Sequence, residues 1–199
     1  VVVHNVGDSA AQEIAVLGIN ESGNVQVQVK DALTGTQISK FNFAKAYKPL
    51  AFAAVPNPGG KLKFLAVLGR NNSGVIRAEI RRANDGALIG KINFSKSYEP
   101  QAFISFADSN GSGGGEISAI GVNNSGAVRA QTREIADGAA VTNINFSKSY
   151  PPVDAIAING VAGTGLNEIA VLGQHTNGQY RLQIKDLLTG ATVNTIPVP

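Results

Sequence analysis

The sequence predicts an all-β fold made of four repeated units, and two observations support this prediction. First, a short apolar segment recurs as EIAVLG at 13–18, FLAVLG at 64–69, EISAIG at 116–121 and EIAVLG at 168–173. The glycines that end these segments follow one another at intervals of 51, 52 and 52 residues, and two further glycine series keep the same register. Second, the stretches between these glycines have strand-like composition and no helical periodicity. Such a period indicates one supersecondary unit copied four times.

Each copy is expected to contain four strands. The first is rich in small residues, which suits an inner strand crowded around an axis, and it covers 1–6, 50–55, 101–107 and 153–158. The second is the AVLG segment, which is apolar at successive positions as in a strand covered on both faces. The third alternates apolar and polar residues, as in VQVQVK, so one face is expected to pack and the other to meet water. The fourth carries ISKFNF, IGKINF, VTNINF and VNTIPVP.

Four-stranded units repeated around an axis are typical of β-propellers. We therefore predict a single domain, a four-bladed β-propeller with four antiparallel strands per blade. Its blades are expected at about 1–49, 50–100, 101–152 and 153–199. The last blade is expected to close against the first by side-to-side packing, without an exchanged strand. A linear β-solenoid is the competing architecture, but its coils are usually shorter and need no gradient from small inner strands to polar outer ones.

The composition argues against several classes of protein. No apolar run approaches the roughly 18 residues of a membrane-spanning helix, so no membrane insertion is expected. There are 17 Lys and Arg against 14 Asp and Glu, spread over all four copies, which argues against a nucleic-acid partner. Cysteine is absent, so there is no disulfide and no thiolate chemistry. Methionine is also absent and the first residue is valine, so we expect a processed product or an excised part of a larger chain.

Catalysis has little support in the sequence. The two histidines, His4 and His175, fall at positions that are not equivalent in the repeat, one on a first strand and one in a turn. No nucleophile-elbow or metal-ligand motif is present. We therefore expect the protein not to be an enzyme.

The linkers between copies are the main candidate binding sites. They read FNFAKAYKP, INFSKSYEP and INFSKSYPP, so each places a tyrosine beside a lysine and an asparagine upstream. An aromatic platform with nearby polar donors suits a sugar or a peptide. The alternative is that each tyrosine fills the gap between two blades while the proline fixes the crossover. The candidate residues are Tyr47, Tyr98, Tyr150, Lys45, Lys96, Lys148, Asn42, Asn93 and Asn145.

A second repeated series consists of Arg77, Arg129 and Arg181, which occupy equivalent positions on the third strands. These arginines could form a repeated anion contact. A solvated outer face of the blades explains them equally well.

The order of a small hydrophobic strand, a loop of Gly, Asp and Asn, and then Glu-Ile-Ala-Val-Leu-Gly resembles the FG-GAP and VCBS-type propeller repeats of bacterial secreted or surface proteins, which are integrin-like. The likeness covers all four copies. It implies a non-catalytic binding or adhesion module for a protein or glycan ligand, in a secreted or cell-surface protein. A glycan-binding lectin with sites between the blades and a purely structural spacer are the alternatives.

Members of that family often hold Ca²⁺ in the loop between the first and second strands. The closest match is the third copy, ADSNGSGGGEIS, where Asp108, Asn110 and Ser112 alternate and Glu116 opens the next strand. Calcium requires about six oxygen ligands with enough negative charge, and the second and fourth copies lack that charge. The resemblance therefore implies a calcium site at the third copy. Ordinary Asx and glycine turns are the competing explanation for this loop.

Overall fold

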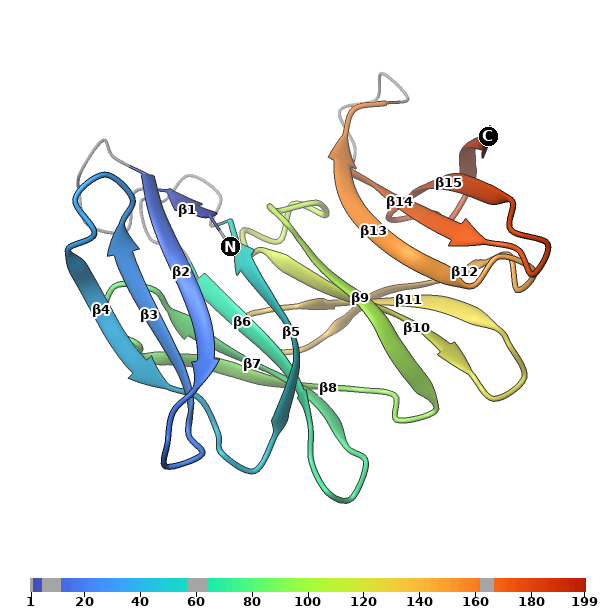
Figure 1. Cartoon of the computed structure of the whole chain (residues 1–199). Helices are drawn as coiled ribbons and strands as arrows, with labels where there is room; N and C mark the ends of the chain where they lie inside the picture. Colours follow the sequence, from blue (N-terminus) through green and yellow to red (C-terminus); the bar gives the residue numbers. More distant parts are fainter. Residues whose placement is uncertain (1, 5–11, 57–63, 162–166) are drawn as a thin grey trace.

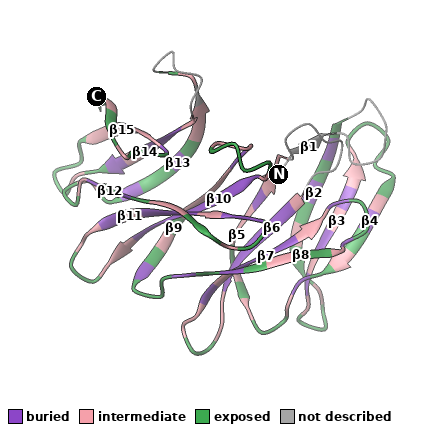
Figure 2. Ribbon diagram, turned by 180° about the vertical axis from the view of Figure 1, so that it is seen from behind, coloured by how far each residue is buried: buried purple, intermediate pink, exposed green. Residues whose placement is uncertain are grey.

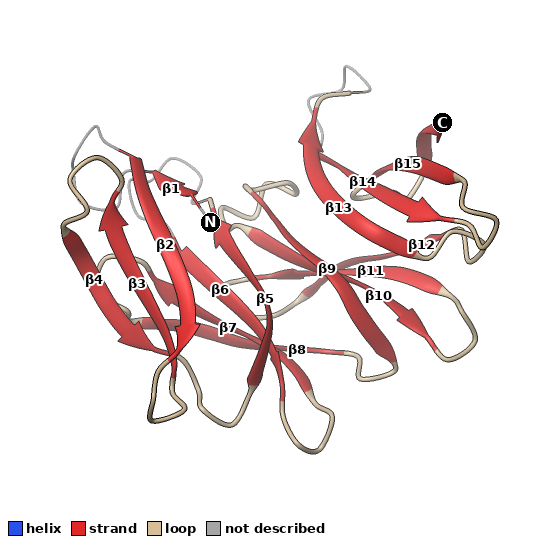
Figure 3. Cartoon of the chain, viewed as in Figure 1, coloured by secondary structure: helices blue, strands red, loops and turns tan. Residues whose placement is uncertain are grey.

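The computed structural model describes residues 2–4, 12–56, 64–161 and 167–199, and this part of the chain consists of strands and loops (Figure 3). Its strands form four antiparallel sheets of four, each with its strands side by side in chain order. We call these sheets blades 1 to 4. Blade 1 contains β1 (Val2–His4), β2 (Gln12–Ile19), β3 (Val25–Asp31) and β4 (Gln37–Asn42). Blade 2 contains β5 (Lys48–Val55), β6 (Phe64–Arg70), β7 (Ile76–Arg82) and β8 (Leu88–Phe94).

Blade 3 contains β9 (Tyr98–Phe106), β10 (Glu116–Asn123), β11 (Val128–Glu134) and β12 (Ala140–Phe146). Blade 4 contains β13 (Pro152–Asn159), β14 (Asn167–Gln174), β15 (Tyr180–Asp186) and β16 (Thr192–Val198). The prediction of an all-β chain with four antiparallel strands in each repeat is therefore confirmed in the described residues. The calcium comparison also concerns residues 5–11, 57–63 and 162–166, which lie outside the described residues.

The expected closed ring is wrong, because the blades form an open arc (Figure 1). Blade 1, in blue, and blade 4, in orange and red, lie at opposite ends, with blades 2 and 3 between them. The first strands of blades 2, 3 and 4 are neighbours, since β9 contacts both β5 and β13. The physical reason for the error is that the angle between blades depends on how side chains interdigitate between the two faces. The number of repeats does not determine that angle.

The hydrophobic core is divided into three clusters, and each lies between two neighbouring blades. In the cluster between blades 1 and 2, β3 supplies Val25, Val27 and Val29, and β6 supplies Leu65 and Val67. The clusters between blades 2 and 3 and between blades 3 and 4 use the equivalent strands. Each core thus joins the third strand of one blade to the second strand of the next. Figure 2 shows buried segments within the sheets and exposed residues along the loops.

The second strands are buried on both faces in blades 2 and 3, which have a blade on each side, and over most of β14 in blade 4. Every residue of β10 from Glu116 to Gly121 is buried, as is most of β6. In β2, by contrast, Ile14 and Val16 are exposed, because no described blade packs against that face of blade 1. The prediction of two covered faces therefore fails for the first copy.

In blades 2 and 3 the third strands alternate as predicted at their ends but not at their centres. Glu79 and Gln131 fall on the face that was expected to meet water, and both are buried. Glu79 accepts a hydrogen bond from the Ala44 backbone N–H, and Gln131 accepts one from the Ser95 backbone N–H. Both donors follow the last strand of the preceding blade. The polar residue at the centre of the third strand is therefore a contact between blades.

Candidate functional site

Each linker tyrosine lies against the glycine near the end of the second strand of the next blade. A Cβ atom added to Gly121 would lie 2.7 Å from the Glu99 carbonyl oxygen and 3.1 Å from Tyr98 Cβ. Gly69 and Gly173 contact Tyr47 and Tyr150 in the same way. Because a side chain would collide with the linker, the glycine allows the linker backbone to approach the strand.

An arginine from the third strand of that same blade lies over each linker tyrosine. The distance from Cζ to the ring centroid is 4.9 Å for Arg77 over Tyr47, 5.0 Å for Arg129 over Tyr98 and 4.0 Å for Arg181 over Tyr150. These distances are in the range of cation–π contacts. The two series that the sequence presented separately therefore form one repeated structure, which we call the Tyr–Arg pair.

Two of the predicted asparagines orient these arginines, but each serves the tyrosine of the preceding linker. Arg77 Nε donates to Asn93 Oδ1 at 2.8 Å, and Arg129 Nε donates to Asn145 Oδ1 at 3.0 Å. Asn93 thus supports the pair of Tyr47, which lies in the linker before it, and not that of Tyr98. In blade 1 the arginine is replaced by Gln26, whose Nε2 donates to Asn42 Oδ1 at 3.0 Å.

The predicted lysines lie on the exposed side of the linkers. Lys96 and Lys148 are exposed. Lys45 is also exposed, and its Nζ donates to the Ser22 carbonyl oxygen at 2.9 Å. The structure therefore brings the tyrosine, lysine and asparagine series to the same junctions but assigns them different neighbours. A signal for the Tyr–Arg pair was present in the sequence, since arginine stands at this position only in the three copies that a tyrosine linker precedes.

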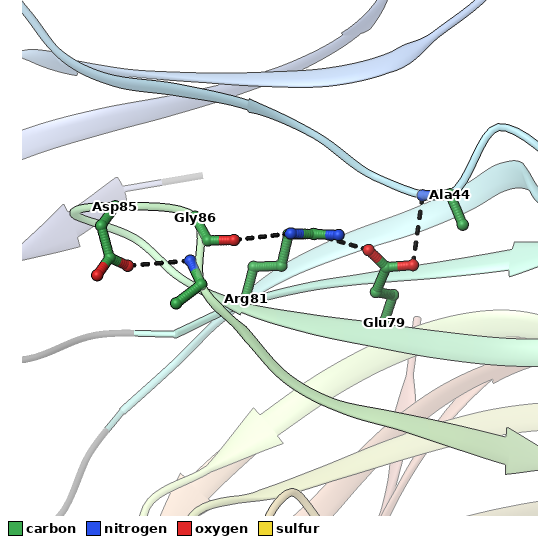
Figure 4. Close-up of polar contacts among 6 residues, drawn as sticks. Ala44, Glu79, Arg81, Asp85 and Gly86 are labelled. Atoms are coloured by element: carbon green, nitrogen blue, oxygen red, sulfur yellow. Dashed lines mark hydrogen bonds and ion pairs between the residues drawn. The ribbon is translucent and has the colours of Figure 1, made fainter.

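A buried charged contact secures the junction of blades 1 and 2 (Figure 4). Glu79 Oε2 accepts the Ala44 N–H at 3.3 Å, and Glu79 Oε1 accepts from Arg81 Nε at 2.7 Å. Arg81 also donates to the Gly86 carbonyl oxygen at 2.7 Å, and Asp85 caps the same turn by accepting the Ala87 N–H. At the other two junctions Gln131 and Gln183 replace Glu79, so the contact between blades persists there without the charge. These contacts stabilise the junction of the two blades.

The third junction is more open than the first. Pro197 stands opposite Arg181 in the β15–β16 register, where the other blades have asparagine. An open cleft of about 680 Å³ lies here, lined by Tyr150, Asn177, Gln179, Tyr180, Arg181 and Pro197. His175 lies 5.3 Å from Tyr150 between ring centroids. At the first junction the corresponding space is only about 10 Å³.

The loop predicted to bind calcium uses its polar atoms internally. Asp108 Oδ2 accepts the Gly113 N–H at 2.9 Å, and Asn110 Oδ1 accepts the Ser112 N–H at 2.9 Å. Ser112 Oγ and the Asn110 amide both donate to Glu134, and the Glu116 carboxylate accepts the Ser109 N–H at 3.0 Å. Asp108 Oδ1 is buried without a described hydrogen bond. These are the contacts of a tight Asx and glycine loop, and calcium binding here stays a prediction.

The surroundings of the Glu116 carboxyl group raise its pKa. Its burial raises the pKa of Glu116 above the ordinary 4.5, against the hydrogen bonds from Ser109. The negative charges of Glu134 and Asp108 add to the rise. In the described part of the chain, no group of three or more His, Asp or Glu side chains is arranged to hold a metal ion. No helix in that part has the length and hydropathy needed to cross a bilayer.

The sequence matches no protein-family model and no curated protein closely enough to assign a family. Solved structures resemble it in fold. They include the Dos1 propeller, with TM-score 0.58, 11% identity and coverage of 97% of this chain and 46% of that one. BBS1N in complex with ARL6DN has a TM-score of 0.60 and 12% identity, and the match covers 100% of this chain and 65% of that one. The rhamnogalacturonan lyase YesW has a TM-score of 0.50 and 13% identity, and the match covers 89% of this chain and 43% of that one.

This chain therefore spans about half the length of the propellers that it resembles. At 11 to 13% identity the likeness concerns the fold alone. The similar structures include both an enzyme, YesW, and a protein in complex with its partner, BBS1N. The comparisons and the four sheets together establish an arc of propeller-type blades.

Proposed function

We propose that this chain is a non-catalytic binding module whose sites are the three Tyr–Arg pairs, and that its ligand is a protein partner bearing carboxylates. The observation that carries the proposal is the repetition of one oriented guanidinium group at each of three consecutive junctions. An arginine placed only for solubility would not need a stacking partner and a hydrogen-bonded asparagine in successive blades.

The geometry leaves the arginines able to bind. The hydrogen bonds described for Arg77 and Arg129 engage Nε, and a guanidinium carries further N–H groups on its Nη atoms. Paired N–H groups match a carboxylate in a bidentate contact. Because the tyrosine ring and the asparagine already hold the side chain, little conformational entropy is lost on binding. The tyrosine ring face is covered by the arginine, so the arginine is the group that would meet the ligand.

Repetition adds avidity to each contact. The three pairs follow one another at one per blade, and the exposed Lys45, Lys96 and Lys148 lie in the same linkers. A partner with several acidic side chains engages a second pair at high effective concentration once the first is bound. BBS1N, a structure of similar fold, is complexed with the protein ARL6DN, which supports a protein partner by analogy of fold. The likeness to FG-GAP and VCBS-type repeats supports a place in a secreted or cell-surface protein.

A lectin is the second candidate, and the cleft at the third junction favours it. Tyr150, Tyr180 and Arg181 bring two aromatic rings and a cation to one open space. This combination suits an acidic sugar, whose ring stacks while its carboxylate meets the guanidinium.

The experiment compares two double variants of equal charge. Arg77→Gln with Arg129→Gln removes both guanidinium groups, and Gln26 shows that glutamine keeps the hydrogen bond to asparagine in this position. The control, Lys40→Gln with Lys91→Gln, removes two exposed lysines from β4 and β8. With fluorescent poly-L-glutamate as probe, we expect the arginine variant to lose affinity about tenfold per arginine and the control to change little.

An equal loss in both double variants would contradict the proposal, because it would show a response to net charge alone. Absence of binding by the wild-type chain at low salt would contradict it as well. Polygalacturonate measured in parallel separates the candidates. Tighter binding of that polymer, lost on Arg181→Gln, would favour the lectin.

A further inference from the structure

The two ends of the arc present unpartnered blade faces that correspond to the two halves of the junctions inside the chain. At each internal junction the second strand of one blade inserts into the face formed by the third and fourth strands of the blade before it. Blade 1 has an inserting face that nothing in the described structure receives. Blade 4 has a receiving face into which nothing is inserted.

The free face of blade 1 is built from the residue types that are buried elsewhere. Ile14 is 42% exposed and Val16 is 55% exposed. Their equivalents in blade 2, Leu65 and Val67, are 0% and 5% exposed. Blades 3 and 4 bury the same two positions. The exposed pair is therefore apolar in the way that a junction requires, and exposure of both residues is unfavourable in water.

The free face of blade 4 is the matching half. Ile196 and Val198 on β16 are 39% and 37% exposed, whereas Ile92 and Phe94, at the same positions of blade 2, are 3% and 6% exposed. Ile156 on β13 is exposed too. These strands enclose an apolar hollow of about 290 Å³ whose lining includes Ile156, Leu172, Leu182 and Val198. An isoleucine and a valine from an inserting face are the side chains that fill such a surface at the junction of blades 3 and 4, where they are Ile169 and Val171.

The blade 1 face is suited to docking without a tyrosine linker. Each internal junction places a linker tyrosine on the second-strand glycine and beneath an arginine. In blade 1 the glycine is Gly18, with no described atom within 4 Å of an added Cβ, and the arginine is replaced by Gln26. A hollow of about 230 Å³ lies between them. If a further blade were joined to blade 1 through a linker of the same kind, the tyrosine of that linker would lie at Gly18. It would then lack the arginine that each of the other three tyrosines contacts. A separate molecule brings no such linker.

The curvature of the arc suggests how many blades complete it. Nearly the whole chain superposes on 46% of the Dos1 propeller, 43% of YesW and 65% of BBS1N, so the first two comparisons correspond to an arc of about half a propeller. We propose that two copies of this chain associate head to tail, with blade 4 of each against blade 1 of the other, and so close one ring of eight blades. A head-to-tail contact that repeats after two copies forms a closed dimer, whereas one that does not close forms an open filament.

The test measures the mass of the 199-residue chain by sedimentation equilibrium over a range of concentrations, with one variant on each face. Wild type is expected at twice the 20.6 kDa of a single chain. Val16→Lys on blade 1 and Ile156→Lys on blade 4 are each expected to raise the dissociation constant about a hundredfold or more, because each buries an unpaired charge. Both residues are exposed in the single chain, so the variants should fold. Leu33→Lys, at an 89% exposed turn position, is the matched control and should remain a dimer.

A mixture of the two face variants discriminates head-to-tail contact from the alternatives. Each mixed pair retains one intact junction, so the mixture should associate more tightly than either variant alone. A monomeric wild type at about 100 µM would overturn the proposal, since that concentration detects any contact with a micromolar dissociation constant. A variant of one face that remains fully dimeric would also overturn it, because blade 1 would then meet blade 1 or blade 4 would meet blade 4. Species that grow beyond a dimer would show that the ring does not close.

Discussion

The second-strand glycines show how a single atom decides whether two blades can be joined by a linker. Gly121 and Gly173 face linker backbone at distances that a Cβ cannot tolerate, and at Gly69 an added Cβ would lie 2.9 Å from Tyr47 Cβ, whereas Gly18 faces open space. Glycine recurs in all four copies, although the structure requires it in only three. The tyrosine above each of the three glycines is in turn held by an arginine. Glycine, tyrosine and arginine thus form one contact between a blade and the linker that leads into it.

Alanine substitution should separate these glycines. Gly121→Ala places Cβ 2.7 Å from the Glu99 carbonyl oxygen, which is backbone and cannot rotate away, so we expect a loss of about 1–3 kcal/mol in the free energy of unfolding. Gly18→Ala meets nothing within 4 Å and should be neutral or stabilising by up to about 1 kcal/mol, as expected when a strand glycine is replaced. Urea denaturation of both variants at one protein concentration measures the difference. Equal effects would show that the linker is not packed as described.

Glu116 should make stability depend on pH. The pKa of Glu116 is higher in the folded protein than its ordinary 4.5, so between these two values the folded chain retains a proton that the unfolded chain has lost. The free energy of unfolding therefore falls as pH rises through this window. Glu116→Gln removes the titration and should gain stability relative to wild type as pH rises from about 4.5 towards neutrality. Its amide oxygen can still accept the Ser109 N–H.

The measurement for Glu116 is thermal unfolding from pH 4 to pH 8, with Glu99→Gln as control. Glu99 is an exposed carboxylate that pairs with Arg70. A constant difference between Glu116→Gln and wild type across this range would contradict the assignment.

At the scale of elements, the turn between the third and fourth strands serves the preceding blade as well as its own hairpin. Gly35 and Gly86 both have positive φ, at 71° and 73°, a conformation that glycine adopts without strain. Of these two glycines, only Gly86, in the β7–β8 turn, lies against another blade. Its added Cβ would be 2.6 Å from Cβ of Phe41 on β4. The turn of blade 2 is therefore also part of the junction with blade 1.

The two turns provide a matched pair of substitutions. Gly35→Ala and Gly86→Ala share the cost of an alanine at positive φ. Gly86→Ala must in addition displace Phe41, so it should reduce the free energy of unfolding by about 1–3 kcal/mol more than Gly35→Ala. Chemical denaturation of the two variants checks the difference. Equal costs would mean that the turn does not support the junction.

The elements themselves could be predicted because their signals are local. Alternation along β3 and β7 and the turn glycines lie within a few residues of the structures they specify. The partners of the linker tyrosines could not be predicted in the same way. Tyr47 precedes β5 and contacts Arg77 on β7, thirty residues later, so the contact exists only once the strands of blade 2 have come together. The buried Glu79 was misplaced for the same reason, since the group that covers it comes from blade 1.

At the scale of the whole molecule, the repeat predicted the number of sheets and the order of their strands but not their curvature. The first-strand residues were expected to crowd a closed axis, and the structure instead opens between blades 4 and 1. Contact of β9 with both β5 and β13 shows that the first strands do lie on the inner side. How far one blade turns relative to the next depends on side-chain volumes summed over a whole face, such as Leu65 and Val67 against Val27. That sum is not visible in any single copy.

Because each core is shared by two blades, no single copy of the repeat contains a complete interior. An added copy would cover the face left open by its predecessor and leave a similar face of its own. Gene duplication can therefore lengthen such a chain one unit at a time, without redesign of the existing interior. For the same reason, an open array of any length has two exposed apolar blade faces until a complementary surface covers them. Selection must therefore act on which surfaces those two faces can bind.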